Sequence, residues 1–211
     1  MINIQKEKIE ESIDYKDEVI REKIAKEFFY KCYLCEGKPI QNYEIDHFYP
    51  KNIYPHLVNQ YENLFFICSK CNKIREKNSN SSSENEILNS CEEDVENSIH
   101  LSIKLDDCKK AILIPIYTED EYFNKKIDNT IKFLDKIYNG VGTTSEAYRC
   151  LRDDIVDEVL LFQSELQMYQ DDYLGTRFEK RFKEKLLKEL ESSSLHSGFK
   201  KTTFLNMKIK L

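Results

Sequence analysis

The sequence lacks the features of membrane and exported proteins. No apolar run approaches the roughly 18 residues that a membrane-spanning helix needs. The N-terminal stretch MINIQKEKIEES has no apolar core of a signal peptide, so no secretory signal is visible. No internal repeat is apparent. A chain of 211 residues, 33% charged and 40% hydrophobic, is expected to form one or two soluble domains in the cytoplasm.

A strongly basic charge balance is also absent, because the net charge is −6. The charge is unevenly distributed, however. Residues 31–77 carry seven basic and five acidic side chains, residues 84–173 carry nine and twenty-one, and residues 177–211 carry ten and four. The acidic excess therefore lies in the middle of the chain. This pattern allows local contacts with phosphate groups but does not predict strong unaided binding to nucleic acid.

The hydrophobic pattern divides the chain into segments. Residues 5–30 have isoleucines at helical spacing, and a second helical pattern begins near residue 121. Between them, residues 98–105 and 111–117 alternate like strands and could pair as a hairpin, with Pro115 favouring an edge. Further predictions are a helix end at the glycines of NGVG (139–142), a capping box at Thr143 and Glu146 before a helix to about Gln170, a helix over 177–191, and a short C-terminal strand.

Four of the seven cysteines form two Cys-x-x-Cys pairs, Cys32/Cys35 and Cys68/Cys71. Two such pairs provide the four thiolates of a tetrahedral Zn²⁺ site, and without an export signal disulfides are not expected. A redox-active or simply buried set of thiols is the alternative. The other cysteines have no partner pattern and are interpreted as ordinary core or surface thiols: Cys91, Cys108 and Cys150.

The 32 residues between the two pairs contain an acid next to a histidine, Asp46-His47. Residues 43–48 have strand character, two prolines then force a loop, and the apolar run at 63–67 predicts a second strand. The basic stretch from 68 to 77 is expected to be helical. An Asp-His dipeptide alone is commonly a satisfied polar pair in a loop, but this one lies between two metal-binding pairs.

The order of these features resembles the HNH endonucleases, which have a ββα-metal core. The resemblance covers residues 32–77 and rests on Asp46-His47, Asn63, and Asn72 after the second cysteine pair. It implies an α+β fold in which a zinc-stabilised ββα-metal module lies within a mainly helical scaffold. By resemblance, His47 is the general base, Asp46 and Asn72 bind a catalytic cation, and Asn63 braces the loop that orients His47.

Elementary chemistry is consistent with these roles. Phosphodiester hydrolysis needs an activated water, whose proton a near-neutral histidine can take, and a cation near the phosphate. Carboxylate and amide oxygens suit Mg²⁺, with Mn²⁺ as an alternative. The sequence has Asn72 where HNH enzymes often have a histidine, which favours a hard cation. Lys51, Lys73 and Arg75 are candidate phosphate contacts, with solvated surface charge as the alternative, and His56 is expected to be a partly exposed structural residue.

A narrower resemblance concerns the stretch EIDHFYPKNIYPHLVNQYENLFFICSKCNKIREKN, which is similar to the HNH subunit of Septu-type and retron-associated anti-phage systems, the PtuB family. This resemblance implies a PtuA-like ABC-type ATPase partner that controls the nuclease, in a complex that can hold more than one copy of the chain. The expected organisation is an N-terminal helical segment (1–30), the nuclease module (31–77), and a mainly helical region for partner docking (78–211).

Three other functions remain open from the sequence. One is an HNH nuclease that cleaves RNA or tRNA, because this chemistry does not require a DNA sugar. The second is a zinc-stabilised module that binds nucleic acid without cutting it. The third is an adaptor in which zinc only fixes a docking surface. Loss of activity in His47→Ala separates the nucleases, whether they cleave DNA or RNA, from the two non-catalytic alternatives.

Overall fold

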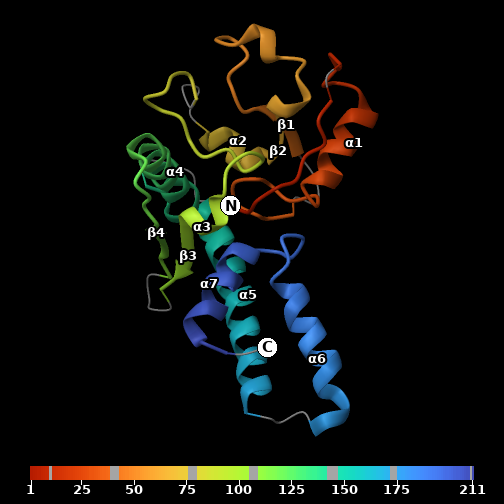
Figure 1. The fold of residues 1–211 in the computed structure, drawn as a ribbon, viewed down its shortest axis with the longest axis vertical. Coiled ribbons are helices and arrows are strands. Elements are labelled where there is room, and N and C mark those ends of the chain that lie inside the picture. Colours follow the sequence, from red (N-terminus) through yellow and green to blue (C-terminus); the bar gives the residue numbers. More distant parts are fainter. Residues whose placement is uncertain are drawn as a thin grey trace.

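The computed structural model of the chain combines helices with two small antiparallel sheets (Figure 1). It describes residues 1–9, 11–38, 43–75, 80–104, 109–141, 147–171, 175–209 and 211. In chain order the elements are α1 (Glu18–Glu27), β1 (Tyr43–His47), η1 (Pro55–Leu57), η2 (Tyr61–Asn63), β2 (Leu64–Cys68), α2 (Ser69–Ile74), α3 (Val95–Ser98), β3 (Ile99–Ile103), β4 (Ala111–Pro115), α4 (Glu121–Asn139), α5 (Ala147–Gln170), α6 (Gly175–Glu189) and α7 (Ser197–Met207).

The segment from β1 to α2 is a hairpin followed by a short helix. β1 pairs antiparallel with β2, so that Tyr43 lies opposite Cys68 and His47 opposite Leu64. All five residues of β2 are buried, as its apolar sequence predicts. The Sγ of Cys68 accepts a hydrogen bond from the backbone N–H of Cys71 and so caps the start of α2. The predicted order of strand, loop, strand and helix is confirmed, although α2 ends at Ile74.

The N-terminal segment differs from the helix predicted over residues 5–30. Only Glu18–Glu27 is helical, with Asp17 as its N-cap, and the described residues before it are not helical. The reason is that this segment finds its partners elsewhere in the chain. The Lys6 Nζ donates to the Tyr61 and Leu64 carbonyls, and the Ile13 N–H donates to the Asn59 carbonyl. Ile9 and Ile13 therefore pack against the core from a non-helical segment, whereas Ile20 and Ile24 do so from α1.

The second sheet is the hairpin of β3 and β4, which confirms the two predicted strands. Ile99 lies opposite Pro115 and Ile103 opposite Ala111. The side chain of Asn139, at the end of α4, accepts from the Ala111 N–H at 2.9 Å and donates to the Ala111 carbonyl at 2.9 Å. These two bonds replace a neighbouring strand at that position of β4, which limits edge-to-edge pairing.

The C-terminal half is mainly helical, as predicted. α4 ends at Gly140, whose left-handed φ of 72° and close approach to the Tyr148 ring exclude a side chain. The predicted capping box at Thr143 and Glu146 lies outside the described residues. The predicted C-terminal strand is wrong, because residues 197–207 form α7 and the described residues after it, 208, 209 and 211, are not in a strand. In α7, Phe199, Thr202 and Thr203 are buried at helical spacing, and this tertiary packing overrides the β preference of threonine.

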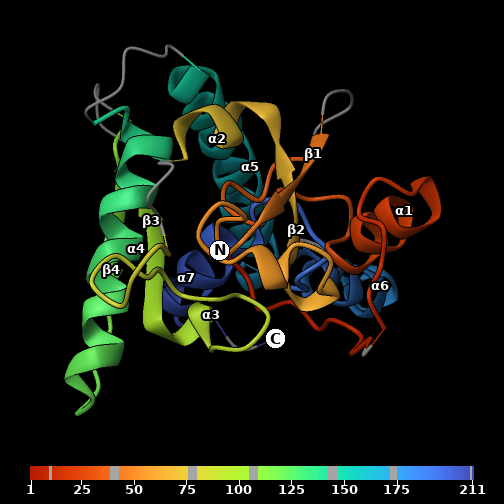
Figure 2. The ribbon, with the colours of Figure 1, turned by 90° about the horizontal axis from the view of Figure 1, so that it is seen from above.

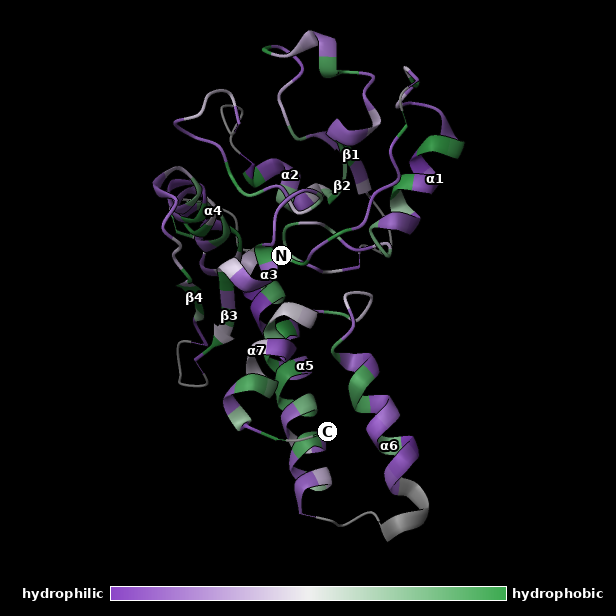
Figure 3. Ribbon diagram, viewed as in Figure 1, coloured by the Kyte–Doolittle hydropathy of each residue, from purple (hydrophilic) through white to green (hydrophobic). Residues whose placement is uncertain are grey.

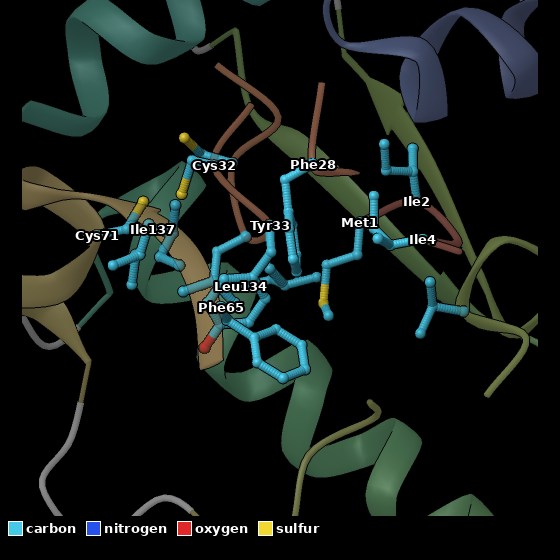
Figure 4. Packing of buried hydrophobic residues seen from close by; sticks show 14 of the residues in the cluster. Met1, Ile2, Ile4, Phe28, Cys32, Tyr33, Phe65, Cys71, Leu134 and Ile137 are labelled. Atoms are coloured by element: carbon cyan, nitrogen blue, oxygen red, sulfur yellow. The ribbon is translucent and has the colours of Figure 1, made fainter. Parts of the chain in front are cut away.

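The main core lies between the β1–β2 hairpin, α1, α4 and the start of α5 (Figures 1 and 2). Figure 4 shows Phe28, Tyr33 and Phe65 packed in this core with Leu134 of α4. A smaller core around Phe162 and Leu186 joins the second half of α5, the end of α6 and the end of α7 with the residues after it. Figure 3 shows both polar and apolar residues on the part of α6 that is coloured. No helix within the described ranges is long and apolar enough to cross a membrane.

Candidate metal centre and active site

The four cysteines of the two Cys-x-x-Cys pairs converge on one point. Their Sγ atoms all lie within 4.8 Å of one another, and those of Cys35 and Cys68 are 3.9 Å apart. Four sulfurs bound to one zinc ion at about 2.3 Å would be separated by about 3.8 Å. The cysteines are free thiols, with Cys68 the most exposed of the four at 9%. The cluster could therefore hold a metal ion such as zinc.

The two cysteine pairs sit in tight backbone turns on different elements. In the first turn the Cys32 N–H donates to the Gly37 carbonyl and the Glu36 N–H donates to the Cys32 carbonyl, both at 2.9 Å. The second pair is at the start of α2, where the Cys71 N–H donates to the Cys68 sulfur at 3.4 Å. A shared metal would thus join the chain before β1 to the helix after β2, across 33 residues of sequence.

The four clustered thiols shift one another's pKa values because their sulfurs lie close together. The thiols of Cys32, Cys35 and Cys71 donate to Cys68 and hold the pKa of Cys68 well below its usual range. Hydrogen bonds with Cys32 and Cys68, together with burial, raise the pKa of Cys35 although the bond with Cys71 lowers it, and bonds with Cys32, Cys35 and Cys68 raise the pKa of Cys71. A metal ion would be needed to stabilise four thiolates at such a short separation.

Asp46 lies against the first cysteine turn and the end of α2. The Tyr33 hydroxyl donates to the Asp46 Oδ2 at 3.0 Å, and the Arg75 guanidinium forms an ion pair with the same oxygen. Arg75 also donates to the Phe48 carbonyl at 2.6 Å, and its side chain is only 6% exposed. Asp46 Oδ1 accepts no hydrogen bond from the described residues, so one carboxylate oxygen is left for another ligand.

Asn72 lies on the same side of β1 but contacts a different carboxylate. Its Nδ2 donates to the Glu44 Oε2 at 2.6 Å. Glu44 and Asp46 are two residues apart on β1 and therefore share a face of the strand. The Asn72 Oδ1, like the Asp46 Oδ1, accepts no hydrogen bond from the described part of the chain. Oxygen donors of this type suit Mg²⁺, so the donor set fits a hard divalent cation.

His47 is the last residue of β1, and its ring contacts Val58 and Tyr15. Its Nε2 lies 3.1 Å from the Val58 carbonyl oxygen. A carbonyl oxygen only accepts, so Nε2 carries the proton and Nδ1 has the free lone pair. Its ring meets the Tyr15 ring edge-on at 4.8 Å. Burial lowers the pKa of His47, the bond to Val58 raises it, and nearby Lys51 lowers it further, so the pKa lies below its usual value.

Asn63 holds the loop that contains the partner of His47. The side chain is 4% exposed, and it accepts from the Tyr49 N–H at 2.7 Å. Its Nδ2 donates to the Tyr49 and Leu57 carbonyls, each at 3.1 Å. The Asn63 carbonyl also accepts from the Phe48 N–H at 2.9 Å. Both ends of the 48–58 loop are thereby fixed to one buried amide, next to the residue that bonds to His47.

The structure brings some of the predicted site residues together and separates others. Within the described residues, no hydrogen bond links His47 to Asp46 or Asn72, since each has its own partners. Lys73 is exposed, and Lys51 is exposed and acts electrostatically on His47, so both are available to a phosphate. His56, expected to be partly exposed, is exposed and lies edge-on to the Tyr54 ring.

Arg75 was expected at the surface as a phosphate contact, and the structure corrects this expectation. Its side chain is buried, and its guanidinium neutralises Asp46. Two other residues near the site were missed by sequence reasoning, Tyr33 and Glu44. Alternation along β1 could have identified Glu44, because it must share the face of Asp46. No local signal points to Tyr33, since its contact with Asp46 depends on how the cysteine turn packs.

Comparison with protein-family models, with curated proteins and with solved structures finds no match to the chain.

Proposed function

We propose that the chain is a metal-dependent endonuclease of the HNH type, which hydrolyses phosphodiester bonds in nucleic acid, with DNA as the main candidate. The observation that carries the proposal is the hydrogen bond between the His47 Nε2 and the Val58 carbonyl. This bond fixes the tautomer and leaves Nδ1 as a base at the end of a strand. The lowered pKa of His47 favours the neutral, proton-accepting form near pH 7.

In this reaction His47 takes a proton from the water that attacks phosphorus. The imidazolium that forms keeps its bond from Nε2 to the Val58 carbonyl, which stabilises the positive charge and holds the ring in place. Asn63 is a positioning residue, because its side chain bonds to Tyr49 and to Leu57, the residue before Val58, and has no hydrogen bond to His47. The sequence resemblance and the hydrogen bonds of Asn63 support the same assignment.

Asp46 and Asn72 are the residues that would hold the catalytic Mg²⁺, through the two Oδ1 atoms that the described residues leave without a donor. When bound, the cation supplies positive charge beside the phosphate and the leaving 3′ oxygen. Glu44 orients Asn72, because it accepts from its amide nitrogen and turns the amide oxygen the other way. Zinc at the four cysteines is structural in this proposal and holds α2 against the hairpin.

The proposal is tested by incubating the purified chain with plasmid DNA and, separately, with total RNA, each with and without Mg²⁺ and without a chelator that would remove the structural zinc. Wild type and His47→Ala are compared, and His56→Ala serves as the control because His56 is exposed on the same loop. We expect Mg²⁺-dependent DNA cleavage that His47→Ala abolishes and His56→Ala retains. Cleavage of RNA alone supports the RNA alternative, and binding without cleavage supports the non-catalytic module.

We also propose that the nuclease works with an ABC-type ATPase in anti-phage defence, as the narrower resemblance implies. The acidic middle of the chain, residues 84–173, is compatible with a nuclease that depends on a partner to engage nucleic acid. The test is to repeat the cleavage assay with the ATPase encoded beside this chain. Activation or restraint of cleavage by the partner supports the proposal, and tight duplex binding by the isolated chain at physiological salt removes its basis.

A further inference from the structure

We propose that a groove along α1 binds a single strand of nucleic acid and leads it to His47. This inference rests on the proposed nuclease function and assigns the substrate path. The groove has a volume of about 1120 Å³ and runs beside Tyr43 of β1. It is lined by four basic side chains, Lys16, Arg21, Lys23 and Lys26, and by two acidic ones, Glu18 and Glu22.

Two of the four cations are free to meet phosphate groups. Lys26 lies 3.6 Å from Glu22, and Lys23 lies 2.6 Å from Glu7, so both are already paired. Lys16 and Arg21 have no carboxylate partner within the described residues. Each lies over an aromatic ring instead: the Lys16 Nζ is 5.9 Å from the Tyr15 centroid, and the Arg21 guanidinium carbon is 5.5 Å from the Tyr43 centroid.

The rings of Tyr15 and Tyr43, over which these two cations lie, connect the groove to His47. The Tyr15 ring touches the His47 ring at 4.8 Å. Tyr43 and His47 are four residues apart on β1 and share one face of the strand, about 13 Å apart at the usual rise per residue. Figures 1 and 2 both show α1 beside the β1–β2 hairpin. A polyanion lying on Arg21 and Lys16 would therefore pass Tyr43 and arrive at His47.

An exposed aromatic ring at the end of α1 favours a single strand over a duplex. Tyr30 is 43% exposed, and its hydroxyl donates at 2.6 Å to Glu22, which lines the groove. Tyr30 and Phe29 both have a φ of 55°, in the left-handed region where glycine would be less strained. We interpret the exposed aromatic rings in this strained turn as surfaces for stacking bases. Unpaired bases stack on such rings, whereas duplex bases are not accessible.

The test measures binding separately from cleavage, by using the full chain with His47→Ala in buffer without Mg²⁺, so that the cysteine-bound zinc is retained. Fluorescence anisotropy of a labelled single-stranded oligonucleotide is compared for three variants in this background. The first is Lys16→Ala/Arg21→Ala, the second is Tyr30→Ala, and the control is Lys132→Ala/Arg181→Ala, which removes one exposed lysine and one exposed arginine from other helices. Circular dichroism melting verifies that each variant is folded. If Tyr30→Ala is not folded, Tyr30→Leu takes its place.

We expect Lys16→Ala/Arg21→Ala to weaken binding at least about ten-fold in 0.1 M salt and to lower the log–log salt slope by about 1.4. Tyr30→Ala should weaken binding about five-fold or more with little change in slope. Unchanged affinity in both variants, an equal loss in the control, or equally tight binding to duplex of the same sequence overturns the inference. Groove binding without cleavage by wild type would instead count against the proposed nuclease alone.

Discussion

The Nε2 of His47 lies 3.1 Å from the carbonyl oxygen of Val58, and the loop that carries Val58 is fixed by the buried amide of Asn63. A histidine held this way has one defined tautomer and one free basic nitrogen. Because Asn63 holds the loop that carries Val58, we expect catalysis by His47 to depend on Asn63, to which it has no hydrogen bond. Each element of this arrangement can be changed separately.

Replacing Asn63 should reduce both stability and cleavage. Asn63→Ala removes three side-chain hydrogen bonds and leaves part-buried backbone groups of Tyr49 and Leu57 without those partners. We expect a loss of about 1–3 kcal/mol in the free energy of unfolding, and a lower kcat in the folded protein because Val58 is no longer held. Urea denaturation and cleavage rates measure the two effects. Asn59→Ala, at the exposed position directly after this loop, should change neither.

The ion pair between Asp46 and Arg75 should show strong coupling. Both side chains are largely buried, at 11% and 6% exposure, so removing either partner leaves a buried charge. Arg75→Ala is expected to destabilise the protein by about 3–5 kcal/mol. Adding Asp46→Asn to Arg75→Ala should restore part of that loss, which a double-mutant cycle of urea denaturation detects. Additive losses would mean that the two charges do not depend on each other.

Zinc content should depend on the four clustered cysteines and not on Cys91. We expect about one zinc ion per chain in the wild type, measured by mass spectrometry of the metal. Cys68→Ser should lower the zinc content and the Tm together, because the ion joins the first cysteine turn to α2. Cys91→Ser is the control, since burial raises the pKa of Cys91 to about 12 and keeps it protonated. Equal zinc content in both variants would contradict the assignment.

Stability should fall on mild acidification because of His196. This residue is 2% exposed, has no partner for Nδ1 in the described protein, and precedes α7. Burial lowers its pKa below 6.5, Glu36 and Glu158 raise it, and Lys31 and Lys200 lower it. Between the lower folded pKa and the unfolded value of about 6.5, the unfolded chain binds more protons, so the free energy of unfolding decreases as the pH falls through that window.

The check is urea denaturation from pH 7.5 to pH 5.5 for wild type and His196→Asn. Asparagine tolerates the left-handed φ of 50° at this position and does not titrate. The wild type should lose stability more steeply than the variant, by at most about 1.4 kcal/mol per pH unit. Parallel curves would mean that His196 is not the group responsible.

Local spacing predicted much of the candidate site, and long-range packing decided the rest. The cysteine cluster was predictable because each Cys-x-x-Cys pair sets its own geometry within four residues. The two strands beside it were predictable from the strand character of residues 43–48 and from the apolar run of β2. The burial of Arg75 was not, because a basic residue at a helix end is normally solvated, and its partner Asp46 is 29 positions earlier in the chain. The extended segment before α1 likewise depends on bonds to Asn59, Tyr61 and Leu64.

The central claim is that His47 acts as the general base, and single-turnover cleavage with and without added imidazole tests it most directly. The assay uses one labelled DNA duplex, one labelled RNA and one labelled single strand, each with Mg²⁺. We predict that His47→Ala cleaves at least about a hundred-fold more slowly than wild type, that imidazole restores part of the rate, and that His56→Ala matches wild type. Undiminished cleavage by His47→Ala, or no cleavage of any substrate by wild type, would contradict the account.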